Sequence, residues 1–357
     1  MKTLKIALFA LAGSLAVSCS DLDLTPRDSA GSGSWFQTPE QFDLNLNALL
    51  HHTYWPMERN EWTSGEQTEL DMLTDDGQNR NAPGRFLIDG VNSDFPLSVR
   101  MWDITYTGIN RCNKIITEIK KLEGVMDQER YDRIVANARF YRACFYARII
   151  IHFGDPVMVP EDMDMDSEQG RQAAYELTRT DMWTVLPDIL KEFDEIAPVL
   201  PISYTGAEIE RATRGAVYGM KARFALYFAS LRKWDTIENN GFGNANEAEA
   251  QKLFAEARDA AWNCMQLGVY TLQSDFGQLF RMSTKHSAEG IFNIPRSKSM
   301  SNNSKYQYLY GGATTAKLPR LSGAPTCTTC LPSWYLLCAF LDDQGKPIDE
   351  STVYDPH

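Results

Sequence analysis

Two regions, residues 54–86 and 299–312, place aromatic side chains among amides, carboxylates and guanidinium groups. Aromatic faces can stack on the apolar C–H surface of a ligand ring, and the polar groups can bind its hydroxyls. This mixture is what binding of a hydroxyl-rich ring compound such as a sugar requires, but for any single aromatic residue, packing within the loop or contact with a partner protein is favoured over ligand binding. The candidate binding residues are Trp55, Trp62, Asp75, Asn79, Arg80, Tyr306, Tyr308 and Tyr310.

The three tyrosines of the second region alternate along the chain. In an extended segment, alternate side chains point to the same side, so Tyr306, Tyr308 and Tyr310 would share one face. That face is either a stacking platform for a ligand or the buried side of an edge strand, and the buried side of a strand is the favoured interpretation.

Motifs for catalysis are missing from the sequence. It contains no GxSxG, HExxH or phosphate-binding loop, and among its five histidines only the adjacent pair His51 and His52 is closely spaced. A glycoside hydrolase needs only two carboxylates roughly 5–10 Å apart, and acidic residues are abundant here. We therefore predict a protein that is not an enzyme, with glycoside hydrolysis as the least favoured alternative.

Metal-binding patterns are incomplete. Asp162, Asp164 and Asp166 are similar to the start of a calcium loop, but Ser167 stands where glycine is required and Ala173 where a bidentate glutamate is required. A solvated acidic loop is expected, with adventitious calcium as the alternative. The sequence predicts no cofactor and no metal site.

The cysteines fall into two groups. Three of them lie in helical patterns and are expected to be buried free thiols: Cys112, Cys144 and Cys264. Cys327 and Cys330 form a single CxxC. A structural zinc site usually takes four ligands from two such pairs, so incidental thiols or a local disulfide are favoured over a metal site.

The composition indicates a folded protein that does not bind nucleic acid. Hydrophobic residues make up 43% of the 357 residues, enough for one large core or two smaller ones. The formal net charge of −12 opposes binding to phosphate backbones.

Helical patterns cover most of the chain between residues 38 and 267. Expected helices follow the capping residues Thr38, Asp127, Thr213 and Asn246, and others cover 98–122 and about 179–196. Trp102, Tyr106, Trp183, Trp234 and Trp262 lie in these patterns and are predicted to belong to the core. Small residues such as Ala216, Gly219 and Ala257 predict close antiparallel helix pairs. Only residues 289–295, EGIFNIP, indicate a strand, and 297–333 indicate a long loop.

The N-terminus has the pattern of a secretory signal. Lys2 and Lys5 precede an apolar run, residues 6–17, that is too short to span a bilayer. Residues 20–34 are polar and rich in glycine and serine, which is typical of a flexible tether.

Several stretches, in order, resemble the SusD/RagB family of surface glycan-binding lipoproteins. They begin with the helix WFQTPEQFDLNLNALLHHTY and the helix WDITYTGINRCNKII. The next, ARFYRACFYARIIIHFGDPVMVP, is similar to the family's most recognisable block. RATRGAVYGMKARFALYFAS, ARDAAWNCMQLGVYTL, DFGQLF, EGIFNIP and PSWYLLCAFLDDQGKPID continue the series.

This resemblance implies a mainly α fold of tetratricopeptide-like helix pairs with long loops and minor β structure. It also implies a non-enzymatic lid that captures oligosaccharide or polysaccharide and passes it to a TonB-dependent SusC-like transporter. A lid that binds peptide or another non-glycan nutrient is the alternative.

The resemblance also gives Cys19 a role. Residues 16–19, Ala-Val-Ser-Cys, resemble a lipoprotein signal, and the acidic residues after Cys19 resemble the export signal of surface lipoproteins. We expect a signal peptide over 1–18, a lipid on Cys19, a tether over 19–34, and location on the surface of the outer membrane. Residues 35–357 would form the SusD-like domain. Because family members are longer, its C-terminal part is expected to be missing.

Overall fold

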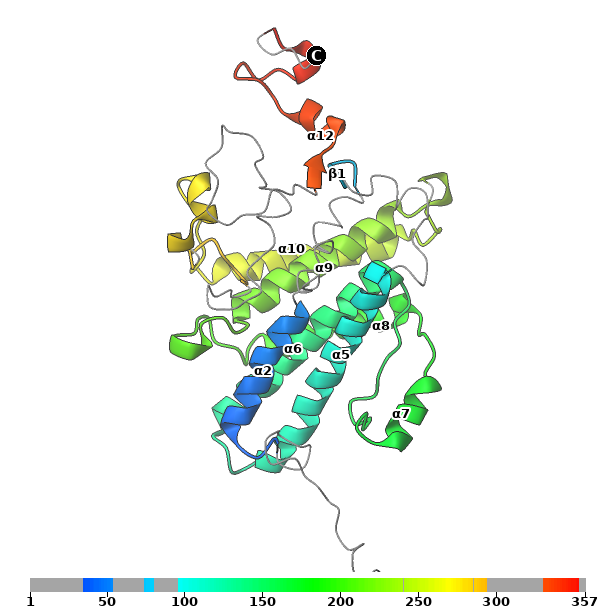
Figure 1. Cartoon of the computed structure of the whole chain (residues 1–357), viewed down its shortest axis with the longest axis vertical. Helices are drawn as coiled ribbons and strands as arrows, with labels where there is room; N and C mark the ends of the chain where they lie inside the picture. Colours follow the sequence, from blue (N-terminus) through cyan, green and yellow to red (C-terminus); the bar gives the residue numbers. More distant parts are fainter. Residues whose placement is uncertain are drawn as a thin grey trace, which may run out of the picture.

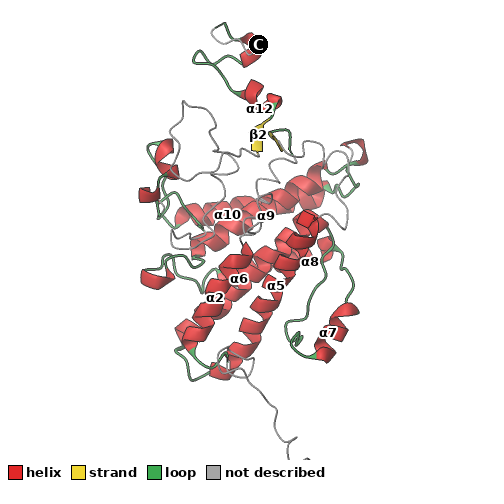
Figure 2. Cartoon of the chain, viewed as in Figure 1, coloured by secondary structure: helices red, strands yellow, loops and turns green. Residues whose placement is uncertain are grey.

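The computed structural model describes residues 35–53, 74–79, 96–239, 241–284, 286–293 and 330–352, and these are mainly α-helical (Figures 1 and 2). The helices are α2 (Pro39–Thr53), α5 (Pro96–Glu118), α6 (Gln128–Phe153), α7 (Glu168–Tyr175), α8 (Met182–Ile196), α9 (Arg214–Trp234), α10 (Glu247–Gln266) and α12 (Trp334–Ala339). The strands β1 (Gly77–Asn79) and β2 (Cys330–Pro332) pair antiparallel, with Gln78 opposite Leu331. The expected mainly α fold is confirmed.

The helices form two layers. Helix α6 packs against α2, α5 and α8, and the α9–α10 pair lies across this bundle through contacts of α9 with α6 and α8 (Figure 1). Helix α7 stands off to one side, and α12 projects from the body beyond the two strands. The bundle and the crossing pair thus form a scaffold whose connecting segments lie at its ends.

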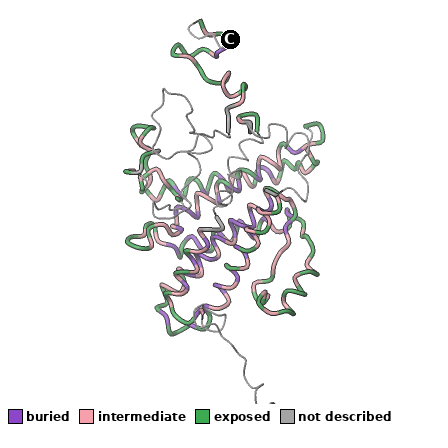
Figure 3. Tube along the Cα trace, in the orientation of Figure 1, coloured by how far each residue is buried: buried purple, intermediate pink, exposed green. Residues whose placement is uncertain are grey.

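Helix α6 is the centre of the core because buried residues occupy most of its circumference. Ile134, Phe140 and Phe145 are fully buried, and buried positions concentrate on α6 and its neighbours (Figure 3). Each large apolar side chain removed from water stabilises the fold by roughly 1.5–3 kcal/mol. Buried residues on most sides of α6 require neighbouring helices on those sides, which explains its central place.

The predicted caps fix the starts of three helices. The Asp127 carboxylate accepts a hydrogen bond from the Arg130 backbone N–H at 2.9 Å. Thr213 and Asn246 cap α9 and α10 in the same way. Helix α6 ends at Gly154, whose φ of +70° favours glycine.

Buried and half-buried charges connect α6 to α5 and α8. Arg142 donates to Asn113 at 3.0 Å, to Glu161 at 2.7 Å and to Glu192 at 2.6 Å. Glu192 also accepts from Nε of Arg139 at 3.0 Å. Burial alone would lower the pKa of Arg142, but the two carboxylates outweigh it and raise this pKa. The guanidinium therefore stays charged and ties three elements together.

Two tryptophans predicted to be buried are not. Trp234 is 60% exposed and Trp262 is 57% exposed. The buried face of α10 consists of small residues, including Ala257 and Ala260, which bring α9 and α10 too close together to hold an indole ring between them. Tyr106 and Trp183 do pack against the core, and Trp102 is partly buried against Tyr106, with 4.6 Å between ring centroids.

The predicted strand at 289–295 is also wrong over the described residues 289–293, which form turns and bends. Phe292 packs edge-on against Phe140 at 5.3 Å between ring centroids. This contact between rings, rather than pairing with a neighbouring strand, holds the segment. The predicted loop at 297–333 contains β2, because Cys330–Pro332 finds a partner in distant β1.

The acidic segment at 161–167 forms a loop, as predicted. Ser167 is the N-cap of α7, accepting from the Gly170 N–H at 2.9 Å. Lys114 Nζ lies 2.6 Å from Asp166 and 3.8 Å from Asp164, so an internal cation offsets part of the charge of these two carboxylates. The described residues contain no group of three or more His, Cys, Asp or Glu side chains that could hold a metal ion.

Cys112, Cys144 and Cys264 are free and buried, as predicted. Burial raises the pKa of Cys144 to about 12, so this thiol stays protonated. None of the described helices is long and apolar enough to span a membrane.

We predict that Glu192→Gln lowers the free energy of unfolding by about 2–3 kcal/mol, because it removes the charge that two half-buried arginines share. Glu195→Gln is the matched control. Glu195 accepts from Arg139 at 2.5 Å on the same helix but is far more exposed, so its loss should be much smaller. Equal losses in urea unfolding of the two variants would contradict this role for Glu192.

Candidate functional site

Of the predicted binding residues, the structure describes Asp75 and Asn79. Asp75 is exposed in the turn before β1, and its backbone carbonyl accepts a hydrogen bond from the Ser333 hydroxyl. Asn79 pairs with Cys330 in the two-stranded ladder. Both residues thus lie beside the segment that leads into α12. The other candidates lie outside the described residues, as does Cys19: Trp55, Trp62, Arg80, Tyr306, Tyr308 and Tyr310.

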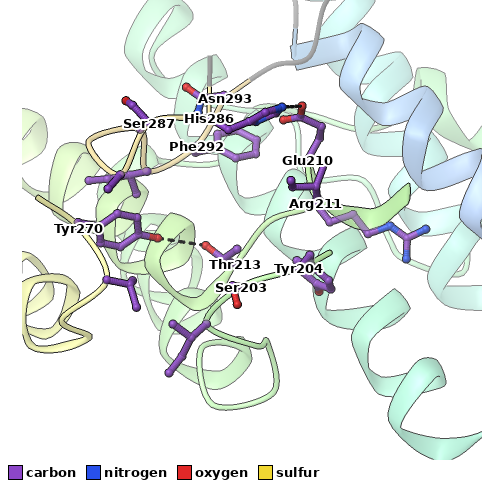
Figure 4. A pocket seen from close by; sticks show the side chains of 16 residues that line it. Ser203, Tyr204, Glu210, Arg211, Thr213, Tyr270, His286, Ser287, Phe292 and Asn293 are labelled. Carbon is purple, nitrogen blue, oxygen red and sulfur yellow. Dashed lines mark hydrogen bonds and ion pairs between the residues drawn. The ribbon is translucent and has the colours of Figure 1, made fainter. Parts of the chain in front are cut away.

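The described residues form a pocket elsewhere, at one end of the α9–α10 pair (Figure 4). Three segments line it: residues 202–213, which precede α9; Val269 and Tyr270, which follow α10; and residues 286–293. Its volume is about 230 Å³. Pockets that enclose a drug-sized ligand measure roughly 300–1,000 Å³, so this one suits a single ring or the end of a longer chain.

The segment before α9 is held by two side chains from helices. Asn137 of α6 donates to the Tyr204 hydroxyl at 3.2 Å and accepts from the Ala212 N–H at 3.1 Å. Arg214 Nε donates to the carbonyls of Ala197 at 3.0 Å and Leu200 at 3.2 Å, which fixes the end of α8 against the start of α9. This wall of the pocket is therefore anchored to the core.

The opposite wall is held by bonds between the segment after α10 and residues 286–293. The Thr271 N–H donates to the Ala288 carbonyl at 3.1 Å, and the Gln273 N–H donates to the Glu289 carboxylate at 2.7 Å. Phe292 is in turn fixed by its packing on Phe140 and Tyr141. Both walls are thus positioned by contacts within the protein.

Aromatic rings face the pocket from all three segments: Tyr204, Tyr270 and Phe292. The hydroxyls of Tyr270 and Thr213 are hydrogen-bonded at 3.3 Å (Figure 4). Burial raises the pKa of Tyr204 and of Tyr270, so both phenols remain neutral and can donate as well as accept. The rings therefore offer apolar faces together with polar edges.

Polar side chains complete the lining. His286 Nε2 lies 3.4 Å from the Glu210 carboxylate, and Asn293, Ser203 and Ser287 add amide and hydroxyl groups (Figure 4). Arg211 points its guanidinium away, to Asp43 at 2.7 Å and to Glu208. Aromatic faces beside such groups suit a ring with apolar C–H surfaces and hydroxyl edges.

The lining described here contains one carboxylate, that of Glu210. Glycoside hydrolysis requires a pair of carboxyl groups flanking the scissile bond. The described lining of this pocket thus supplies one of the two carboxyl groups that such a reaction requires.

A glycine permits the close approach of Tyr270 to α9. A Cβ on Gly215 would overlap the Tyr270 hydroxyl, and the Gly215 carbonyl accepts from the Cys264 thiol at 3.6 Å. Sequence patterns did not reveal this pocket, because Tyr204, Tyr270 and Phe292 are far apart in the chain. The available signal in the sequence was that Tyr204 precedes the predicted α9–α10 pair and Tyr270 follows it.

A family model matches residues 37–226, more than half of the chain. It describes SusD-like proteins as "starch-binding associating with outer membrane". The chain belongs to this SusD-like family. No curated protein matches it significantly.

Solved structures of SusD-like proteins share the fold. A SusD-like carbohydrate-binding protein from Bacteroides fragilis aligns over 90% of this chain and 57% of its own length, with a TM-score of 0.68 at 19% identity. A SusD superfamily protein from Parabacteroides distasonis aligns over 85% and 60%, with a TM-score of 0.65 at 18% identity. A laminarin-binding SusD-like protein aligns over 71% and 50%, with a TM-score of 0.52 at 17% identity. The chain therefore spans 50–60% of the length of these SusD-like structures.

We predict that Gly215→Ala lowers the free energy of unfolding by about 1–3 kcal/mol and displaces Tyr270, because the added methyl group overlaps its hydroxyl. Gly219→Ala on the same helix is the control. Its Cβ would lie 3.1 Å from the Ile291 side chain, and alanine favours a helix over glycine by about 1 kcal/mol. It should leave stability nearly unchanged. Equal losses of stability in urea unfolding of the two variants would contradict the close contact of Tyr270 with α9.

Proposed function

We propose that this SusD-like protein captures oligosaccharide or polysaccharide at the cell surface and passes it to a TonB-dependent SusC-like transporter. The pocket of Figure 4 carries the proposal, because Tyr204, Tyr270 and Phe292 supply stacking faces beside hydroxyl-binding groups. The family description, starch-binding and associating with the outer membrane, agrees with this chemistry.

The dimensions of the pocket refine the proposal. A volume of about 230 Å³ accommodates one sugar unit rather than a long chain, so the rest of a polysaccharide would extend outside. Binding one unit of a larger chain suits a protein that holds a polymer briefly and then releases it, because the contact area and hence the affinity stay limited.

We also propose that Cys19 carries a lipid that holds the protein at the outer membrane. The lipoprotein-like sequence at 16–19 supports this arrangement. Acyl chains contribute about 0.8 kcal/mol per buried methylene, so a multiply acylated cysteine anchors a protein firmly.

If the pocket of Figure 4 binds glycan, Tyr270→Ala should weaken retention in polysaccharide affinity gels at least tenfold, because a stacking face and a hydroxyl are lost together. Tyr175→Ala is the control, since Tyr175 is 83% exposed on α7, away from the pocket. Retention that is equal in both variants would place glycan binding elsewhere. Quenching of tryptophan fluorescence by peptides but not by sugars would favour the non-glycan lid instead.

The anchor and the transporter are tested together in membrane fractions. The wild-type protein should incorporate labelled palmitate and copurify with an outer-membrane β-barrel transporter, whereas Cys19→Ala should lose the label and leave the membrane fraction. Cys338→Ala is the matched control, because Cys338 is a free thiol outside the proposed signal. Palmitate incorporation that survives in Cys19→Ala, or a wild-type protein that copurifies with no transporter, would contradict the proposal.

A further inference from the structure

A second cavity, of about 180 Å³, lies between α6, α9 and Phe292. Its walls include Phe140 and Phe145, both fully buried, together with Phe292 and Met220. At roughly 30 Å³ per water molecule, its volume equals that of about six waters. This is room for a small chemical group or for part of one ring.

Two arginines line the same cavity, Arg148 of α6 and Arg223 of α9. Burial lowers the pKa of Arg148, and the positive charge of Arg223, which lines the same cavity, lowers it further. Among the described residues no carboxylate forms an ion pair with Arg223, which is exposed and therefore marks the side of the cavity that faces solvent.

Several other arginines are neutralised within the protein. The chain has a net charge of −12, and Arg139, Arg142 and Arg211 are each paired with carboxylates. Arg223, which lies beside the aromatic walls, has no such carboxylate partner among the described residues. A ligand that brings a negative oxygen group to the guanidinium groups and an apolar surface to the rings would satisfy both features.

We propose that the cavity between α6 and α9 binds a carboxylate or sulfate group carried on a sugar ring, with Arg223 and Arg148 as its cationic partners. This inference rests on the proposed function for its choice of a sugar as the carrier. Phe292 lines both cavities, so the anion site adjoins the pocket of Figure 4. The favoured ligand is therefore an acidic glycan, with one unit in each cavity.

Calorimetric titration of the full chain with three probes tests this site: sodium glucuronate, glucose 6-sulfate and glucose, at equal ionic strength. The acidic sugars should bind at least tenfold more tightly than glucose. Arg223→Gln should weaken their binding at least tenfold, because a charge-assisted hydrogen bond is lost. Arg223→Lys should retain part of the affinity.

Arg258→Gln is the matched control, since Arg258 is an exposed arginine of α10 and its side chain is 72% exposed. It should leave the affinity for both acidic sugars unchanged. Met220→Trp, which fills the cavity, should abolish binding of the acidic sugars while unfolding at a temperature close to that of the wild type. Preference for glucuronate over glucose 6-sulfate would identify carboxylate as the group that the cavity takes, and the reverse would identify sulfate.

Acidic sugars that bind no better than glucose, or that bind equally to wild type and Arg223→Gln, would overturn the anion site. The proposed function would survive that result if neutral polysaccharide is still retained in affinity gels. Conversely, binding of acidic sugars that depends on Arg223, without retention of any polysaccharide, would support the anion site and contradict glycan capture.

Discussion

The pocket of Figure 4 depends on the hydrogen bonds that the side-chain amide of Asn137 forms. Asn137 is 1% exposed on the central helix α6 and uses three hydrogen bonds: to the Arg133 carbonyl at 2.9 Å, to the Tyr204 hydroxyl and from the Ala212 N–H. A buried amide without partners costs about 1–3 kcal/mol, so this geometry is strongly preferred. It fixes the chain just before α9, and α9 in turn positions α10 and Tyr270.

Charge pairing gives the bundle its second constraint. Several of its half-buried arginines are held by carboxylates from other elements, as Arg142 is by Glu161 of the loop after α6 and by Glu192 of α8. Such pairs contribute orientation more than net stability, because the cost of removing both ions from water offsets much of their attraction. Arg223 differs because its side chain lines a cavity and forms no ion pair with a described carboxylate. It is therefore a candidate for contact with a ligand.

Local features of the structure could be predicted from the sequence, but contacts between distant segments could not. The caps at Asp127, Thr213 and Asn246 depend on residues three positions apart, so sequence spacing is sufficient to identify them. Trp262 was predicted to be buried because helical periodicity weights large apolar residues more heavily, whereas its helix packs through small residues. Phe292 was assigned to a strand because the sequence does not show its packing on Phe140, which is far away in the chain.

The most direct test of the account is hydrogen–deuterium exchange of the full chain with and without a retained polysaccharide. If the pocket of Figure 4 is the binding site, backbone amides of residues 202–213, 269–273 and 286–293 should exchange more slowly when the ligand is present. Amides of α7, which lies away from the pocket, should exchange at an unchanged rate. Slowing that is absent from these three segments and concentrated in other parts of the chain would contradict the account.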